Sequence, residues 1–284
     1  MNAFFPLLAA VFQAGSLTLD KFVLSGHRVA HKTYIGVSFP LIFLIALVLF
    51  LLFRPPLNSE LFSGYSGSLI VASAFLAVAS NLIYYRALEG DQLSEIESLD
   101  ILQTLPIIFI SSIIFTDERK VVVVIPAIIA SLAIIWSHWE HHHITIRRYT
   151  KLFFLRVLCV APLSAVILKI LLATWNPLSL ELVRSGIVAL LLSPLFFAHA
   201  HEVKDSAMRY IVLTNILTTI AWILLYFGYR ELGVVHTVLI LSIQPLLVWG
   251  ASILFLREKF KLRKFIAFVV VLISIAVALV LGGA

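Results

Sequence analysis

The sequence predicts an all-α polytopic membrane protein with ten transmembrane helices. The chain of 284 residues is 61% hydrophobic and only 13% charged, whereas soluble domains are about half apolar and about a quarter charged. So few polar residues could not cover a surface that faces water. A membrane-spanning helix needs about 20 mostly apolar residues, and ten such stretches follow one another here. Barrel strands are excluded because runs such as 121–133 and 265–281 are apolar without alternation.

Loop-forming residues separate these spans and justify each of them in turn. Residues 1–19 contain no Lys or Arg, unlike a secretory signal, so we expect them to be retained as the first helix. The clearest later boundaries are Arg54-Pro55-Pro56, Asp117-Glu118-Arg119-Lys120, Asn176-Pro177 and the polar runs 137–151, 199–209 and 257–264. The predicted spans are 4–25, 34–53, 67–88, 94–115, 121–137, 153–173, 178–198, 209–229, 234–256 and 263–282.

The two halves of the chain show similar patterns in the same order. Ser16 and Lys21 in the first span match Ser164 and Lys169 in the sixth at the same offset. The fourth and ninth spans each contain a proline, and each is followed by a Glu-basic pair. Together these matches favour duplication. A five-helix unit crosses the membrane an odd number of times, so the second copy is expected to be inverted, with any solute site near the midplane between the halves.

These features together resemble the EamA-type transporters of the drug/metabolite transporter superfamily. The resemblance rests on two five-helix halves, the segment Tyr84-Tyr85-Arg86-Ala87-Leu88, the prolines Pro106 and Pro245, and the pairs Glu118-Arg119 and Glu258-Lys259. It covers the whole chain. It implies a first repeat over residues 1–140, a second over 152–284, and a connecting loop at 141–151.

The same resemblance implies a function. It predicts a secondary transporter that moves a small organic solute (a metabolite, an amino acid or a drug-like molecule) by alternating access, and that is not an enzyme and needs no cofactor. The expected partners are that solute and the lipid bilayer, in the cytoplasmic membrane of a bacterium or archaeon. No Walker loop, Gly-Xaa-Ser-Xaa-Gly or His-Glu-Xaa-Xaa-His motif occurs, which disfavours ATP-driven transport and hydrolysis.

Two lysines inside the spans are candidates for solute binding. Charged residues within a membrane are costly and suggest a function. Lys21 and Lys169 occupy equivalent places in the two halves. Both lie near the end of a span, so both can also extend to a membrane interface as anchors. The sequence leaves these two interpretations open.

The fourth span carries candidate acids. Glu97, Asp100 and Thr104 fall on one helical face, and Asp100 is expected to lie deepest and to contact the solute. A desolvated carboxyl tends to bind a proton unless a cation is near. Asp100 or Glu97 is therefore a candidate for coupling transport to protons. In the alternative interpretation the helix begins near Leu99 and leaves Glu95 and Glu97 in the wet interface.

Further polar and aromatic residues complete the predicted site. Tyr85, Trp222 and Tyr226 are expected to stack on the solute, although aromatic belts at membrane interfaces are a common alternative. Gln103 and Gln244, just before Pro106 and Pro245, are expected to support helix bends by binding carbonyls that proline frees. Glu181 and Arg184, spaced i, i+3, are expected to form a structural pair.

Histidines provide a rival hypothesis. Eight of the nine histidines lie in the loops after the first, fifth and seventh spans, on one face of the membrane. His138, His142, His199 and His201 could bind a transition metal, which would make the protein a membrane-embedded metal-responsive sensor or enzyme. The spacing is not that of a fixed metal motif, so this alternative is the weaker one.

Loop charges predict the orientation. The loops after odd-numbered spans hold 13 Lys and Arg and the opposite face holds four. By the positive-inside rule the first set is cytoplasmic, which would place both termini outside, whereas the resemblance implies both termini inside. The net charge of +6 needs no nucleic-acid partner, because cytoplasmic loops of membrane proteins are enriched in Lys and Arg.

Overall fold

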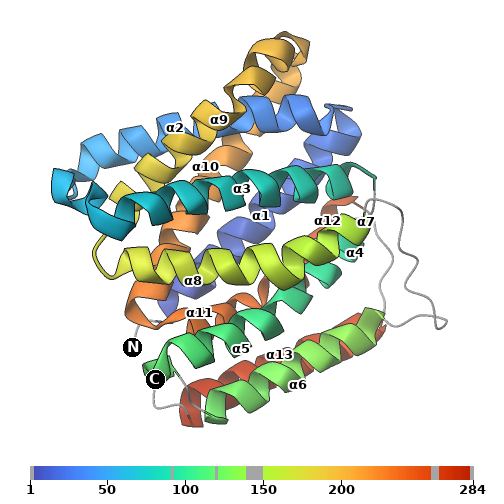
Figure 1. Cartoon of the computed structure of the whole chain (residues 1–284). Coiled ribbons are helices and arrows are strands. Elements are labelled where there is room, and N and C mark those ends of the chain that lie inside the picture. The colour runs from blue at the N-terminus through green and yellow to red at the C-terminus, as the bar shows by residue number, and fades with distance from the viewer. Residues whose placement is uncertain (1–2, 91–92, 119–120, 139–149, 257–261, 282–284) are drawn as a thin grey trace.

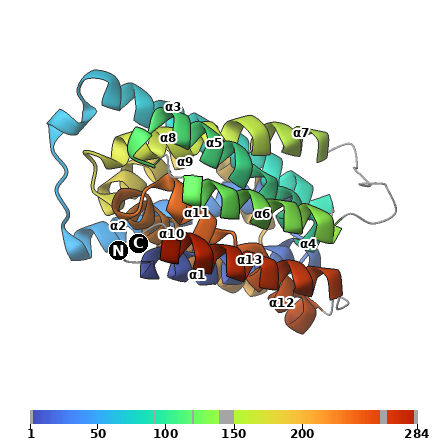
Figure 2. The ribbon, with the colours of Figure 1, turned by 90° about the horizontal axis from the view of Figure 1, so that it is seen from below.

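The described part of the chain folds into a bundle of packed helices, in which α1, α9 and α10 cross the others at an angle (Figure 1). The computed structural model describes residues 3–90, 93–118, 121–138, 150–256 and 262–281, and these contain no strand. The N- and C-terminal ends lie close together at one end of the bundle (Figures 1 and 2). This end is called the terminal end below, and the opposite one the loop end.

Ten helical stretches follow one another in the described residues, as the sequence predicts. The first five are α1 (Phe4–Gly26), α2 (His31–Phe53), α3 (Gly64–Gly90), the broken helix α4 (Leu93–Asp100), η2 (Ile101–Gln103) and α5 (Thr104–Ile114), and α6 (Val121–His138). The second five are α7 (Thr150–Leu155) continued by η4 (Arg156–Val160) and α8 (Ala161–Leu172), α9 (Pro177–His199), α10 (Asp205–Glu231), the pair α11 (Val234–Leu241) and α12 (Gln244–Leu256), and α13 (Leu262–Leu281). Short helices η1 (Ser59–Phe62), η3 (Thr116–Glu118) and η5 (Ala200–Glu202) lie in the connections.

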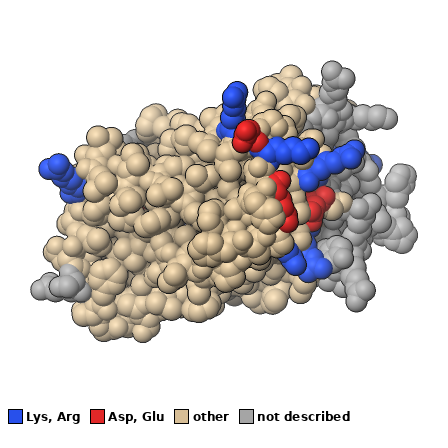
Figure 3. Space-filling view, turned by 90° about the horizontal axis from the view of Figure 1, so that it is seen from above, with Lys and Arg blue, Asp and Glu red and all other residues tan. Residues whose placement is uncertain are grey.

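The surface is that of an integral, multi-pass membrane protein. Within the described residues seven helical segments are long and apolar enough to cross a bilayer, and 101–114 and 265–274 add shorter apolar stretches. Large apolar side chains such as Leu52, Leu190 and Phe197 are more than 70% exposed, which a water-soluble monomer rarely shows over a wide area. On the face in Figure 3, charged side chains gather over one half, and the other half is uncharged up to a basic group at its far edge.

Local sequence explains where individual helices begin and end. The Asn176 side chain accepts a hydrogen bond from the Leu178 N–H (3.0 Å) and Pro177 follows as the first helical residue of α9, which is a favourable helix start. At the end of α2, Arg54 adopts the left-handed conformation and two prolines follow, so the helix cannot continue.

The fourth and ninth spans are interrupted near their middle, and proline explains both breaks. The predicted continuous helices 94–115 and 234–256 are each divided, at 101–103 and at 242–243. Pro106 and Pro245 lie just after the breaks. Proline has no N–H to donate to the carbonyl four residues earlier and its ring collides with that carbonyl. The chain therefore restarts its helix immediately before each proline.

A second irregularity lies in the sixth span, where one helical turn is wider than an α-helical turn. Residues Arg156–Val160 form one turn of π-helix (η4) before α8. Pro162 lies two residues into α8, where its missing N–H removes the bond to the carbonyl of Leu158. Such turns are common at functional sites because they shift a side chain out of its regular register. Here the turn carries Arg156, a residue of the candidate functional site.

Helices from the two halves of the chain pack against each other along their lengths. α1 lies along α10, α2 along α9, and α6 along α13, and Figures 1 and 2 both show the last pair side by side. The α2–α9 contact is close because Gly36 has no side chain: a Cβ atom there would lie 2.9 Å from the Leu195 carbonyl carbon. The two halves therefore pack directly against each other.

The close approach of α2 and α9 gives a first prediction. Replacing Gly36 by alanine forces the two backbones apart, because the new methyl group meets backbone atoms, and overpacking of this kind costs about 1–3 kcal/mol. We expect Gly36→Ala to lower the thermal unfolding temperature of the detergent-solubilised protein. Gly250→Ala is the matched control, since nothing lies within 4 Å of the added Cβ in α12. Equal stability of the two variants would contradict the packing described here.

Candidate functional site

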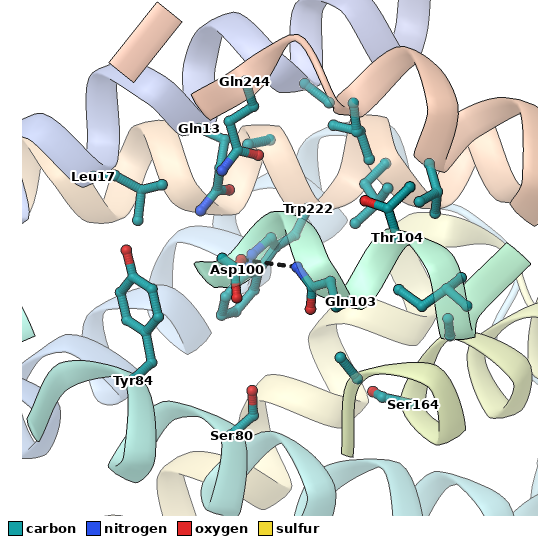
Figure 4. Close-up of a pocket in the computed structure, with 18 of the residues that line it drawn as sticks. Gln13, Leu17, Ser80, Tyr84, Asp100, Gln103, Thr104, Ser164, Trp222 and Gln244 are labelled. Carbon is teal, nitrogen blue, oxygen red and sulfur yellow. Dashed lines mark hydrogen bonds between the residues drawn. The ribbon is translucent and has the colours of Figure 1, made fainter. Parts of the chain in front are cut away.

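A cavity of about 250 Å³ lies in the centre of the bundle. It is lined by α1, α3, the broken helix α4–η2–α5, η4 with α8, α10, and α11 with α12. These are the first, third, fourth, sixth, eighth and ninth spans, and α9 adds one residue, Arg184. Figure 4 shows Ser80 and Tyr84 of α3 facing Gln13 and Gln244 across the hollow, with Asp100 between them. The volume and the mixed polar and aromatic lining suit a small organic molecule.

One part of the cavity is built around an ion pair between Asp100 and Arg156. The Arg156 guanidinium bonds Asp100 Oδ1, and its Nε donates to the Ser80 hydroxyl at 2.9 Å. Gln103 Nε2 donates to Asp100 Oδ2 at 2.8 Å, and the guanidinium carbon lies 5.0 Å from the centre of the Tyr84 ring. Both charged side chains are only 11–13% exposed. Each charge therefore depends on the other for its stabilisation.

Glu97 lies one turn before Asp100, and its hydrogen-bond partners among the described residues are neutral. The Tyr84 hydroxyl donates to Glu97 Oε1 at 2.7 Å and Gln244 Nε2 donates to Oε2 at 3.1 Å. The residue is 1% exposed. These bonds connect α3, α4 and α12 around one carboxyl group, and Glu97 lines the cavity together with Asp100.

Arg184 supplies a second guanidinium to the cavity lining. Its NH1 donates to the Tyr226 hydroxyl at 2.5 Å and lies 3.9 Å from Glu181 Oε2. The guanidinium carbon is 5.8 Å from the centre of the Trp222 ring. Its Nε has no hydrogen-bond partner among the described residues. Because a guanidinium has five N–H donors, this group retains donors for a ligand.

Lys21 and Lys169 lie outside the cavity lining and bind the ends of helices instead. Lys21 Nζ donates to the Leu88 carbonyl at 2.7 Å, near the end of α3. Lys169 Nζ donates to the Tyr229 carbonyl at 2.9 Å, near the end of α10. A cation is stabilised at a helix C-terminus by the dipole and by the carbonyls that lack helical partners. The two lysines therefore have matching positions in the structure as well as in the sequence.

Lys169 also belongs to a contact that joins the two halves at the terminal end of the bundle. Its amine lies 3.4 Å from Glu118 Oε1. The two Glu118 oxygens accept hydrogen bonds from the N–H groups of Val234 and Val235 at 3.0 and 2.9 Å, so the carboxylate binds the N-terminus of α11. Gly233 precedes this helix at φ +84°, and a Cβ there would lie 2.5 Å from Glu118 Oε1. Glycine is required for this close contact.

The structure brings most of the sequence-predicted site residues together. Those that line the cavity are Asp100, Glu97, Tyr85, Trp222, Tyr226, Gln103, Gln244 and Pro245. Pro106 is the third residue of α5, beside the break. α4 begins at Leu93, so the alternative start near Leu99 is wrong. The amides of Gln103 and Gln244 bind the acids Asp100 and Glu97 and not the carbonyls freed by proline, because a buried carboxyl is the stronger acceptor.

Sequence reasoning missed Arg156 and placed Arg184 only in a structural pair. Arg156 stands at the start of a predicted span, where arginine is usual as an interfacial anchor. Its distance from Asp100 in the chain gives no sign that the two meet. The available signal was the proline at 162, which predicts an irregular turn just before it. For Arg184 the signal was its position in the interior of an apolar helix.

The histidines form small separate contacts at the loop end. His31 Nδ1 lies 2.6 Å from Glu89 Oε2, and His199 Nδ1 lies 3.0 Å from Glu202 Oε1. His201 is exposed. Among the described residues no three His, Cys, Asp or Glu side chains are grouped as metal ligands. His142 and the side chain of His138 lie outside the described residues.

Comparison with known proteins gives a family match over part of this chain. Residues 149–280 match the model of the EamA-like transporter family. A solved structure described only as the crystal structure of a protein superposes with a TM-score of 0.74 at 15% sequence identity, covering 99% of this chain and 97% of that chain. At this identity the likeness shows a shared fold. No curated protein sequence matches this chain.

The buried ion pair gives a second prediction. Asp100→Asn and Arg156→Gln should each lower the stability by about 3–5 kcal/mol, because each leaves the other charge buried without its partner. The double variant should lose clearly less than the sum. Glu89→Gln is the control: it breaks the more exposed pair with His31 and should cost at most about 1 kcal/mol. Tryptophan fluorescence during detergent denaturation provides the readout, and strictly additive losses at Asp100 and Arg156 would refute the pairing.

Proposed function

We propose that this chain, which carries an EamA-like transporter family domain over residues 149–280, is a secondary carrier of a small organic solute that works by alternating access. The observation that carries the proposal is the central cavity. It is lined by helices from both halves of the chain and combines two arginines, two acids and several aromatic rings. Such a site between two halves is where secondary transporters bind their solutes.

We infer that the two halves are inverted repeats, residues 1–140 and 152–284 with 141–151 as the connection. Three paired features support this. α3 and α10 each have 27 residues. Lys21 and Lys169 bind the ends of these two helices. The fourth and ninth spans are both divided just before a proline. Five spans in each half would give the halves opposite directions in the membrane.

The proposed solute site consists of Asp100, Tyr85, Trp222 and Tyr226, with Arg184 in the role first considered for the lysines. Aromatic rings offer flat apolar contact area, and Arg184 and Asp100 add charges of opposite sign. Lys21 and Lys169 keep a supporting role, because each holds the end of a helix whose side chains line the cavity.

Proton coupling is a further part of the proposal, and the contacts favour Glu97 over Asp100 for it. The two carboxyls are one helical turn apart, and both line the cavity together with Arg156. Arg156 bonds Asp100 directly and so stabilises its ionised form. Glu97 is buried and has only neutral donors, so neutralisation by a proton costs it less.

The charge distribution supports an orientation with the loop end in the cytoplasm. Figure 3 shows the charged side chains of one face gathered over one half of the bundle. Lys and Arg are concentrated in the loops after odd-numbered spans. By the positive-inside rule these loops are cytoplasmic, and both termini are then outside.

A vesicle experiment tests the proposed site. The protein is reconstituted into liposomes and given a mixture of isotope-labelled amino acids, nucleosides, sugars and organic acids, and mass spectrometry identifies what enters. We expect at least one solute to accumulate beyond its level in empty liposomes. Arg184→Gln should reduce this uptake by about tenfold or more, since a hydrogen bond to a charged group is worth about 1.5–3 kcal/mol.

Arg209→Gln serves as the matched control for this variant. Arg209 lies on α10 but is exposed and outside the cavity, so its loss should leave uptake unchanged. Uptake that survives Arg184→Gln intact, in protein with normal thermal stability, would show that the solute binds elsewhere.

A further inference from the structure

A buried carboxyl group on α1 lies outside the cavity lining, and no cation among the described residues bonds it. Asp20 is 0% exposed. Its Oδ1 accepts hydrogen bonds from the hydroxyls of Tyr34 on α2 and Thr214 on α10, and its Oδ2 accepts one from Tyr85 on α3 at 3.0 Å. The neighbouring lysine, Lys21, directs its amine to the Leu88 carbonyl. Three neutral donors from three helices therefore surround one acid in an apolar interior.

The surroundings of Asp20 offer hydrogen bonds to both the ionised and the protonated form. Thr214 Oγ1 lies within bonding distance of two acceptors, Asp20 Oδ1 and the Ser16 carbonyl oxygen, the latter at 3.0 Å. A hydroxyl has one proton to donate, so it can serve only one of them at a time. When Asp20 is ionised, Thr214 donates to the carboxylate. When Asp20 is protonated, the acid donates to Thr214, and the Thr214 proton turns to the Ser16 carbonyl.

Hydroxyl groups connect this carboxyl to the central cavity. Tyr85 bonds Asp20 directly and also lines the cavity. A second chain leads from Thr214 to Ser16 Oγ at 2.9 Å and on to Thr218, which lines the cavity too. Each hydroxyl can pass on its own proton while its oxygen accepts another, so a proton from cavity water reaches the carboxylate and every intermediate hydroxyl ends unchanged.

We propose that Asp20 is a proton-binding site, and that it takes up and releases a proton through Tyr85 and the Ser16–Thr214–Thr218 hydroxyls as the carrier moves between its states. This inference rests on the carrier function proposed above. It adds a site, distinct from Glu97 and Asp100, whose ligand is a proton. The step is balanced: carboxylate and proton give the neutral acid, and release reverses it.

The position of Asp20 explains how a proton at this site would influence the two halves. α1 packs along α10, and the Thr214 bond is a direct link between them. A hydrogen bond to an ionised carboxylate is roughly twice as strong as a neutral one. Protonation therefore weakens the attachment of α10 to α1, and deprotonation strengthens it.

In the described structure, no charged side chain of the surrounding helices bonds the Asp20 carboxyl. The titratable partners are Tyr34 from α2 and Tyr85 from α3. α4 and α11, which also pack against α1, carry Glu97, Asp100 and His236 as buried titratable side chains. Glu97 is bonded to Tyr84 and Gln244, and Asp100 is bonded to Arg156 and Gln103. α12 has no charged residue between Gln244 and Leu256. The carboxyl is thus set to respond to proton concentration in the cavity.

Infrared spectroscopy of the full-length protein in lipid vesicles tests this directly. The carbonyl stretch of a protonated buried carboxyl is followed between about pH 3 and pH 9, a range that includes the ordinary pKa of Asp. We expect one titrating band that is present in the wild type and absent in Asp20→Asn. Asp205→Asn, which removes an exposed acid, should leave this band unchanged. A spectrum of Asp20→Asn that keeps every titrating buried-carboxyl band would overturn the proposal.

A second pair of variants keeps the proposal testable if Asp20→Asn does not fold. Thr214→Val removes a donor to the carboxylate and should raise the midpoint of the band by about one pH unit, a tenfold change in proton affinity. Thr219→Val is the matched control, because the Thr219 hydroxyl on the same helix bonds the Asn215 carbonyl at 2.7 Å instead. Equal midpoints in the two valine variants would also overturn the proposal.

The infrared band of Asp20 can be measured without any solute transport. The proton-site proposal and the carrier proposal can therefore be tested independently. A titrating Asp20 in a protein that moves none of the solutes offered would contradict the carrier function alone. Uptake of a solute by a protein in which Asp20 does not titrate would contradict the proton site alone.

Discussion

The centre of this molecule is organised by the cost of placing charge in a medium without water. An ionised side chain inside a bilayer must be bonded to a partner or give up its charge. In the described structure Asp100 is paired with Arg156, Glu118 with Lys169 and an α11 helix end, and Asp20 with three hydroxyls. Most of these contacts join helices that are not consecutive in the chain, so the partners of the charges also influence how the helices are arranged around the cavity.

The same requirement produces the division of roles between lysine and arginine. Lys21 and Lys169 bind helix C-termini, where a compact ammonium group satisfies a few carbonyls. Arg156 and Arg184 line the cavity, where a planar guanidinium can bond several groups and lie over an aromatic ring at once. A solute with a flat apolar part and a polar end would find both kinds of contact there, which is the basis of the proposed carrier function.

The sequence predicts the all-helical membrane fold well, because long apolar runs and the loops between them follow directly from the thickness of a bilayer. It also predicts that Glu97, Asp100 and Thr104 share a face, since helical periodicity is a local property. It does not predict which residues meet across the bundle. The Asp100–Arg156 pair and the Thr214 link to Asp20 depend on tertiary packing, and Arg156 also depends on a π-turn that only Pro162 indicates. The helix-capping role of the lysines was hidden for the same reason, because the carbonyls that they bind belong to other helices.

Distance measurements between spin labels test whether the two halves move so that the cavity opens alternately to the two sides of the membrane. With Cys159 replaced by serine, one pair of labels is placed at Asn58 and Glu231 toward the terminal end, and another at Arg28 and Lys204 toward the loop end; all four residues are exposed. On addition of the solute identified by the vesicle screen, alternating access predicts that one label-to-label distance lengthens while the other shortens. Distances that stay constant, or that change in the same direction at both ends, would contradict alternating access.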